Sequence, residues 1–258
     1  MSETSNTENY CKNCNHTFTK QYCNGCGQKN AHRITIPHLG HEVMHATLHA
    51  DKGIFPFMKR ILVSPGIMAK EYIDGKRKTF NPMQFLMLSI AFVILMMTLT
   101  HFYERVELWE AQSISADQSA AQAKMQEKLK GFNTFIKKNG NLMVLFLMPI
   151  FAFFGSLLFR KRNNNYAEHL MISVFAICLS NMLTAIMLTT YYFLGVGVTP
   201  IVVSTLAITV FSFFLTYKQF YQLAWFQAVW RSITVYSLTM IVYVILAFVV
   251  TVFILVFT

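Results

Sequence analysis

Charged residues are scarce in this 258-residue chain, since Asp, Glu, Lys and Arg together make up only 13% of it. Ordinary soluble domains carry about 25% charged residues, so this composition excludes a chain that is soluble along its whole length. Apolar residues fill the deficit, because 54% of the chain is hydrophobic and 15% is aromatic. The sequence therefore predicts an all-α integral membrane protein.

Five apolar runs are long enough to cross a bilayer, which requires about 20 helical residues. Asn81-Pro82 is typical of a helix start and opens the first run, and Thr199-Pro200 opens the fourth in the same way. The fourth run is short, which leaves a re-entrant segment open. The predicted spans are residues 82–101, 142–159, 170–194, 200–217 and 233–257.

The interiors of these runs lack Asp, Glu, Lys and Arg. Ionisable groups inside the membrane are usually the working parts of proton relays and ion-coupled carriers, so their absence argues against both classes. Polar residues do occur within the runs, and we interpret them as groups that hydrogen-bond one helix to another. They are Ser180, Asn181, Thr184, Thr209 and Ser212.

Basic residues are distributed unevenly between the two sides of the membrane, to which successive loops between the predicted spans alternate. Sixteen Lys and Arg residues fall on the side of the N-terminus, and six fall on the other side, within an expected external helical arm at 102–141. The positive-inside rule then places the N-terminus in the cytoplasm and, after five spans, the C-terminus outside. The first 30 residues lack the apolar core of a cleavable signal peptide.

Cysteine is almost absent after residue 26, but four of the five cysteines precede that point as two CxxC pairs. Two such turns present four thiolates to one tetrahedral Zn²⁺, while disulfides or a redox pair are the alternatives. Residues 10–30 are too few to bury a useful apolar core, so structural zinc would supply most of the folding free energy. We expect a disordered segment at 1–9 and a zinc ribbon at 10–30, with the ligands Cys11, Cys14, Cys23 and Cys26.

Four histidines form a stripe on a helix predicted to start near Thr35 and Pro37. Residues 41–45 read HEVMH and match HExxH, in which two histidines bind zinc and the glutamate activates water. A zinc protease also needs a third ligand, for which Asp51, Glu168 and His169 are candidates, and His49 does not fit the extended motif. A packed or interfacial polar face remains open, and we expect no enzyme. The candidate second metal site is His41, His45, His49 and Asp51.

Residues 31–81 also contain two short segments that are apolar on one side and basic on the other. One is Gly53–Val63, and the other starts at Ser64-Pro65 and ends at Gly75. We expect both to be amphipathic helices on the inner leaflet, and the aromatic-rich residues 217–230 to form another interfacial helix.

A basic cluster directly precedes the first span, and each cation there contributes about 1 kcal/mol towards anionic lipid headgroups. Such a cluster either fixes the topology or binds lipid. Because juxtamembrane residues account for the net charge of +10, no nucleic-acid partner is expected. The candidate headgroup residues are Lys76, Arg77 and Lys78.

The order of these motifs over residues 10–90 resembles a bacterial family catalogued as a domain of unknown function, number 3667. The matching elements are the CxxC and CxxCGQ pairs, the His-rich helix, the SPG turn at 64–66, the EYIDGKR run at 71–77 and Asn81-Pro82. The resemblance implies a zinc-ribbon protein of the bacterial inner membrane, and it implies no activity. In that membrane, the external C-terminus expected from the basic residues would be periplasmic.

These features favour an accessory or scaffold protein with a five-span membrane domain at 82–258. Its ribbon and His-rich helix would bind a protein partner at the cytoplasmic face, and its spans would anchor the protein or hold another subunit within the membrane. A lipid- or small-molecule-moving protein is the alternative, and a membrane zinc hydrolase that uses the HExxH helix is the third hypothesis.

Overall fold

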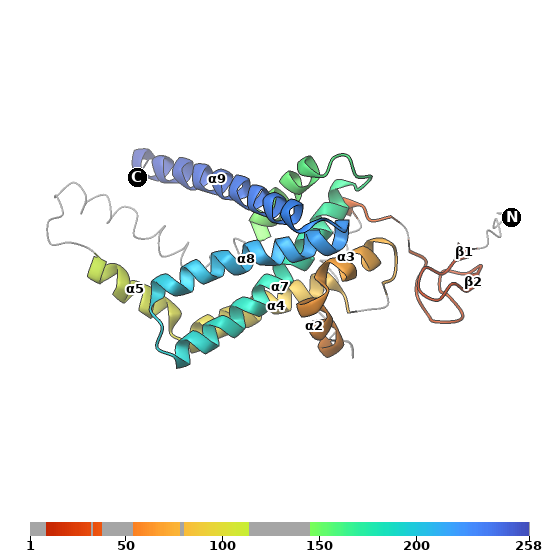
Figure 1. The fold of residues 1–258 in the computed structure, drawn as a ribbon, viewed down its shortest axis with the longest axis horizontal. Helices are drawn as coiled ribbons and strands as arrows, with labels where there is room; N and C mark the ends of the chain where they lie inside the picture. Colours follow the sequence, from red (N-terminus) through yellow and green to blue (C-terminus); the bar gives the residue numbers. More distant parts are fainter. Residues whose placement is uncertain (1–8, 32, 38–53, 78–79, 114–144, 258) are drawn as a thin grey trace.

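The computed structural model describes residues 9–31, 33–37, 54–77, 80–113 and 145–257 (Figure 1). Two short strands precede a set of helices. The elements are β1 (Asn9–Tyr10), β2 (Thr17–Phe18), α2 (Ile54–Val63), α3 (Pro65–Ile73), α4 (Pro82–Leu99), α5 (Phe102–Ser113), a helix at Leu145–Leu158, α7 (Tyr166–Phe193), α8 (Val198–Tyr221) and α9 (Trp225–Phe257).

Four of these helices, α4, α7, α8 and α9, are long and apolar enough to cross a membrane. The prediction of a mainly helical chain with membrane-span candidates is confirmed to that extent. Helix Leu145–Leu158 falls below 18 residues. At 1.5 Å per residue it reaches about 21 Å, short of the roughly 30 Å hydrocarbon core of a bilayer. The described part of the predicted second span is therefore shorter than a full crossing.

The boundaries of α7 and α8 differ from their predicted positions. α8 starts at Val198 after the N-cap Gly197 and runs for 24 residues, so the predictions of a start at Thr199-Pro200 and of a short fourth run are wrong. α7 starts earlier than residue 170 because Asn165 and Glu168 form a capping box around a polar first turn. A hydropathy pattern misses such a turn, since caps are polar.

The aromatic segment at 217–230 does not form one interfacial helix, so that prediction is wrong. Gln222 adopts a left-handed conformation with φ of 53°, and it ends α8 before α9 begins at Trp225. Tyr221 is therefore buried at the end of α8, whereas Trp225 and Phe226 are exposed at the start of α9.

The helix bundle has two distinguishable ends. At one end Arg33 donates a hydrogen bond to the carbonyl of Asn163, so the segment after the ribbon meets the turn before α7. At the other end Arg105 of α5 donates to the carbonyl of Val196 between α7 and α8. Figure 1 shows the strands and α5 on opposite sides of the bundle. We call the first side the ribbon end.

α7 is the central helix, because 78% of its most apolar 18-residue stretch is buried. Polar contacts tie it to both neighbours: Asn181 donates to Ser89 of α4 at 3.0 Å, and the hydroxyls of Ser180 and Thr209 of α8 lie 3.1 Å apart. The prediction of helix–helix hydrogen bonds is confirmed for these residues. Ser212 instead donates to the Ile208 carbonyl within its own helix.

α3 starts after the N-cap Ser64 and ends before Gly75 as predicted, α2 ends at Val63 as predicted, and both helices pack on the bundle. The Phe57 ring of α2 lies 4.7 Å from Phe85 of α4 and 6.1 Å from Phe175 of α7, measured between ring centroids. α3 buries Met68, Ala69 and Tyr72 on one face. Protein contacts, rather than lipid contacts alone, therefore hold both short helices in place.

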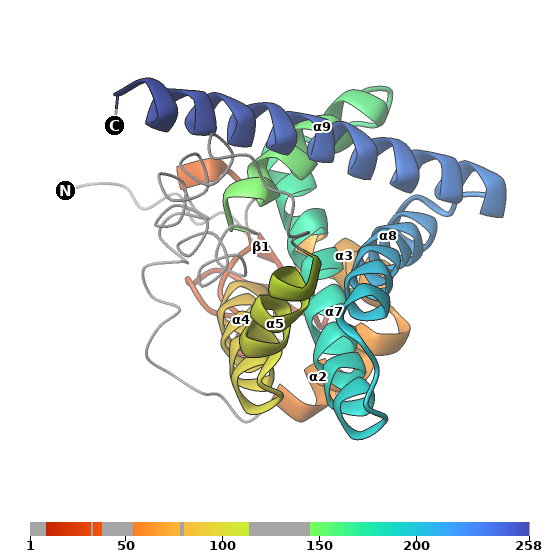
Figure 2. The ribbon, with the colours of Figure 1, turned by 90° about the vertical axis from the view of Figure 1, so that its left-hand side faces the viewer.

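α9 is the most exposed of the candidate spans, because only 11% of its most apolar 18-residue stretch is buried. Figure 2, which looks along the bundle, shows α9 lying across one side of it, next to α8 and the helix at Leu145–Leu158. Its second half presents apolar side chains outwards, such as Ile245, Phe248 and Phe253. The predicted disordered segment at 1–9 lies outside the described residues except for Asn9, as does the predicted external arm beyond Ser113.

Candidate metal centre

The four predicted cysteine ligands converge on one point. One sulfur atom from each of Cys11, Cys14, Cys23 and Cys26 lies within 4.8 Å of the other three. The Sγ atoms of Cys11 and Cys26 are 3.6 Å apart, and those of Cys14 and Cys23 are 3.5 Å apart. A tetrahedral Zn²⁺ with Zn–S bonds of about 2.3 Å requires S···S separations of about 3.8 Å. The residues present thus fit a four-thiolate metal ion.

The two CxxC turns share one backbone geometry. The amide of Asn15 donates to the Cys11 carbonyl at 2.9 Å, and the amide of Gly27 donates to the Cys23 carbonyl at 2.8 Å. Both donors lie four residues after a cysteine, and both have positive φ, 59° for Asn15 and 74° for Gly27. Asn and Gly are the residues that tolerate this conformation best. The sequence therefore builds the same knuckle twice.

The ribbon contains little apolar core besides its own cysteines. Its buried cluster is Cys11, Phe18 and Cys23, with Cys26 packed against it. A hydrogen bond from the backbone of Gln28 is the main influence that lowers the pKa of Cys26, to about 6. A thiolate is the metal-binding form of cysteine, and this hydrogen bond favours that form at Cys26. All five cysteines have free thiols, which is the state that a metal site requires.

Gln28, directly after the second knuckle, connects the ribbon to the helices. Its side-chain amide donates to the carbonyl of Gly75 at 2.8 Å, and its side-chain oxygen accepts from the amide of Arg77 at 3.1 Å. Gly75 has φ of +100°, and a Cβ there would lie 3.1 Å from the side chain of Lys12. We call the contact of Gln28 with Gly75 and Arg77 the Gln28 latch.

A second attachment follows the ribbon. The Arg33 guanidinium lies 2.7 Å from the Glu168 carboxylate, and this hydrogen bond raises the pKa of Arg33. Asn165 donates to the Ile34 carbonyl at 3.0 Å, and the Ile34 side chain is buried in the main core. Together with the Gln28 latch, these contacts hold the ribbon at two points.

Sequence reasoning missed both attachments, although Gln28 and the DGKR run were already part of the family motifs. Glu168 was considered as a third metal ligand, but its carboxylate accepts from Arg33, from the Asn164 side chain and from the Asn165 amide. His169 is buried, with its Nδ1 3.3 Å from the Tyr221 hydroxyl. These contacts account for both residues without a metal.

The candidate second metal site, His41, His45, His49 and Asp51, lies outside the described residues, so it stays a prediction. Residues 36–37 are helical, as expected for the start of that helix. Of the candidate headgroup residues, Lys76 is exposed, and the Arg77 guanidinium lies 5.3 Å from the centre of the Tyr72 ring. Lys78 is outside the described part.

The latch loop, the helices before it and most of α4 belong to a recognisable segment. Residues 51–94 match the family model described as Protein of unknown function (DUF3667). This is the family that the motifs predicted, although the matched segment begins after the ribbon. No curated protein and no solved structure matches the chain. The matched segment supplies Gly75 and Arg77, so it contains the half of the Gln28 latch that receives the ribbon.

Proposed function

We propose that this protein is a membrane scaffold whose zinc ribbon presents a docking surface for an acidic protein partner. The Gln28 latch carries the proposal. A metal-binding tail that acted as a free tether would need no fixed orientation. This ribbon is instead fixed by Gln28, which is 7% exposed and is hydrogen-bonded at both ends of its side-chain amide. Fixing a ribbon against the helices costs chain entropy, and it is useful where one face must be held towards a partner.

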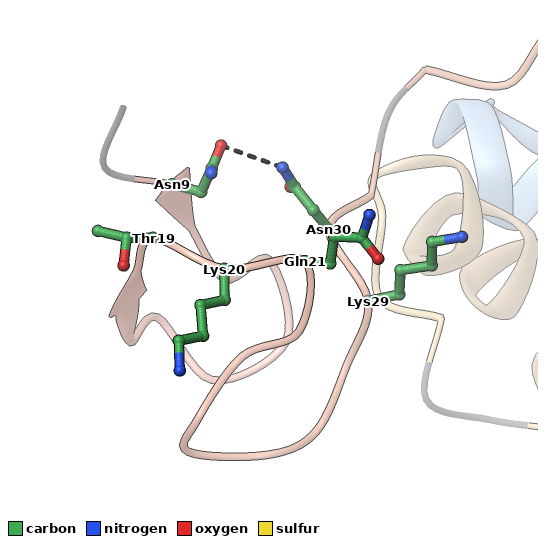
Figure 3. Close-up of a pocket in the computed structure, with 6 residues that line it drawn as sticks. All are labelled: Asn9, Thr19, Lys20, Gln21, Lys29 and Asn30. Atoms are coloured by element: carbon green, nitrogen blue, oxygen red, sulfur yellow. Dashed lines mark hydrogen bonds between the residues drawn. The ribbon is translucent and has the colours of Figure 1, made fainter. Parts of the chain in front are cut away.

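The outward surface of the ribbon favours an acidic partner. Residues 9–31 contain three lysines and no Asp or Glu. Tyr10 and Tyr22 are exposed there, at 61% and 54%, and exposed tyrosines are frequent anchors of protein interfaces. The ribbon also has a cavity of about 270 Å³, and Figure 3 shows the Lys20 and Lys29 side chains among the residues that line it. Its other lining residues are Asn9, Thr19, Gln21 and Asn30.

The membrane part fits an anchoring role. Three of the candidate spans, α4, α7 and α8, are joined by hydroxyl and amide contacts such as Asn181 to Ser89, which position helices without offering a charged path. The ribbon end carries the basic clusters at 76–77 and 160–162, and this distribution supports a cytoplasmic ribbon in a bacterial inner membrane. Zinc, rather than another metal, suits four thiolates in a reducing compartment.

Charge reversal of the ribbon surface tests the proposed partner. We expect a stoichiometric partner to co-purify with the wild type in mild detergent and to be lost from Lys20→Glu/Lys29→Glu. The reason is that like charges across an interface repel and slow association. Binding should also weaken as salt rises from 0.05 to about 0.5 M, because exposed charges are screened. Tandem purification with quantitative mass spectrometry is the measurement.

Lys161→Glu is the matched control, since Lys161 is an exposed cation of the ribbon end outside the ribbon itself. It should retain the partner, and all three proteins should retain equal metal. If the wild type brings down no stoichiometric partner, or if the ribbon variant retains it, the scaffold proposal is wrong.

Loosening the latch gives a separate prediction. Gln28→Ala leaves the Gly75 carbonyl and the Arg77 amide without their side-chain partner, which costs about 1–3 kcal/mol. We expect limited proteolysis between the ribbon and α2 to become roughly tenfold faster, because detached states are more populated. Gln21→Ala, on the exposed surface of the same ribbon, should leave the cleavage rate unchanged. Equal rates for both variants would contradict the latch.

A further inference from the structure

A second cavity of about 270 Å³ opens at the ribbon end, away from the metal centre. Three separate segments line it: the last turn of α3, the turn before α7 and the end of α8. Enclosing pockets for drug-sized ligands usually span 300–1,000 Å³, so this volume suits a small polar group rather than a large cofactor. We call it the α3–α8 cavity.

The charges that line this cavity have no counterions among the residues that the structure describes. Lys70 and Asp74 come from α3, and Arg162 comes from the turn before α7. Within the described ranges, no ion pair involves any of these three side chains. Nearby Glu71 is different, because it pairs with Arg60 at 2.8 Å. The α3–α8 cavity therefore combines two unpaired cations with one unpaired carboxylate.

Asp74 is exposed and has no ion-pair partner among the described residues. It is the C-cap residue of α3, where the helix dipole is negative and a second negative charge is unfavourable. Lys70, one turn earlier, interacts favourably with the same dipole. A ligand that brings a positive group to Asp74 and a negative group to Lys70 and Arg162 would satisfy all three charges at once.

The surroundings of the cavity indicate the source of such a ligand. Phe220 and Tyr221 form its apolar wall at the end of α8. Four residues later α9 begins with Trp225, which is 65% exposed and lies 4.5 Å from the Lys218 ammonium. Exposed tryptophans beside cations are typical of the headgroup level of a membrane. The cavity thus opens where lipid headgroups would lie.

We propose that the α3–α8 cavity binds the headgroup of an amine-bearing zwitterionic phospholipid, with its phosphate at Lys70 and Arg162 and its ammonium at Asp74. A purely anionic headgroup would leave Asp74 uncompensated and repelled. A quaternary amine is bulkier than a primary ammonium and cannot donate hydrogen bonds to the carboxylate. The site rests on the membrane insertion proposed above, but it does not depend on a protein partner.

Native mass spectrometry of the delipidated full chain in detergent tests the site. Phosphatidylethanolamine, phosphatidylglycerol and phosphatidylcholine are titrated separately, and we expect phosphatidylethanolamine to bind most tightly. Lys70→Gln/Arg162→Gln should weaken its binding about 30-fold, because each direct hydrogen bond to the phosphate that is lost costs about 1 kcal/mol, or about fivefold. Asp74→Asn should remove the preference over phosphatidylglycerol. Lys161→Gln, whose residue does not line the cavity, is the control and should bind as the wild type does.

Three results would overturn the proposal: equal affinity of the wild type for the three lipids, unchanged binding by the double variant, or a preference that survives Asp74→Asn. Soluble phosphoethanolamine is the fourth arm. If it binds as tightly as the lipid, the ligand is a free phosphate ester and the lipid assignment is wrong. Extraction of membranes with alkaline carbonate tests insertion on its own, and a missing protein partner leaves these lipid results unaffected.

Discussion

Substitution of one metal ligand, Cys11→Ser, is expected to abolish metal binding by the ribbon. The Cys11 sulfur lies 3.6 Å from that of Cys26, and the apolar cluster of the ribbon consists mainly of ligands. Structural zinc in such small sites contributes on the order of 10 kcal/mol to folding, and no other core is available to replace it. Elemental mass spectrometry should show ribbon zinc falling from one per chain to less than about 0.1.

The helices should survive this loss, because their core is a separate cluster from that of the ribbon. Cys11→Ser should remain monodisperse in detergent while protease cleaves it in the ribbon. Cys178→Ala is the matched control: Cys178 is buried in α7, and its thiol is 4.0 Å from the Pro82 carbonyl. That variant should keep its metal. Full metal content in Cys11→Ser would show that the four cysteines are not the site.

The same measurement addresses the predicted histidine site. A His41→Ala/His45→Ala variant that contains one zinc fewer than the wild type would establish a second metal ion. Equal content in the two proteins would confine metal to the ribbon.

Local chemistry explains why the metal centre was predictable and its attachment was not. The CxxC spacing itself determines which sulfurs meet, because each knuckle closes within six residues. Gln28 and Gly75 are 47 positions apart, and an exposed glutamine in a motif looks no different from one that will be buried. Arg33 and Glu168 are 135 positions apart. Sequence patterns and spacing contain little information about contacts between residues that lie so far apart in the chain.

Some helix boundaries were likewise predictable from the sequence, and others were not. Asn81 was predictable as an N-cap, and its side chain accepts from the Met83 amide at 2.9 Å. The end of α8 was not, since Gln222 takes a left-handed conformation that is more usual for Gly or Asn. Burial of Tyr217 and Tyr221 on the bundle prevailed over the interfacial preference that their aromatic rings suggested. Packing therefore decided where a run of aromatic residues was divided.

Gly66→Ala is expected to be the most disruptive small substitution in the helices. Gly66 lies in the first turn of α3, where α3 crosses α8 in direct contact. An added Cβ would lie 2.2 Å from the Thr216 carbonyl oxygen and 2.7 Å from the Phe220 nitrogen. Real Cβ atoms do not approach backbone so closely, and backbone atoms in a helix cannot rotate away as a flexible side chain can.

If α3 moves away from α8 to make room for the added Cβ, two hydrogen bonds between the helices are also disturbed. Gln219 of α8 accepts from the Gly66 amide at 3.0 Å and donates to the Val63 carbonyl at 2.8 Å. Overpacking alone typically costs 1–3 kcal/mol, and separating these partners adds about 1 kcal/mol for each hydrogen bond lost. A lower melting temperature in detergent, and less monodisperse protein after heating, are the expected results.

Gly197→Ala supplies the control for this prediction. Gly197 is the N-cap of α8, its φ is an ordinary −66°, and nothing lies within 4 Å of an added Cβ. The two substitutions add the same methyl group, and Ala is a poorer N-cap than Gly, so a larger loss in Gly66→Ala than in Gly197→Ala reports the close crossing. If Gly66→Ala melts within a degree or two of Gly197→Ala, α3 is not held against α8 at this glycine. The SPG turn of the family motif would then need another explanation than close packing of α3 on the bundle.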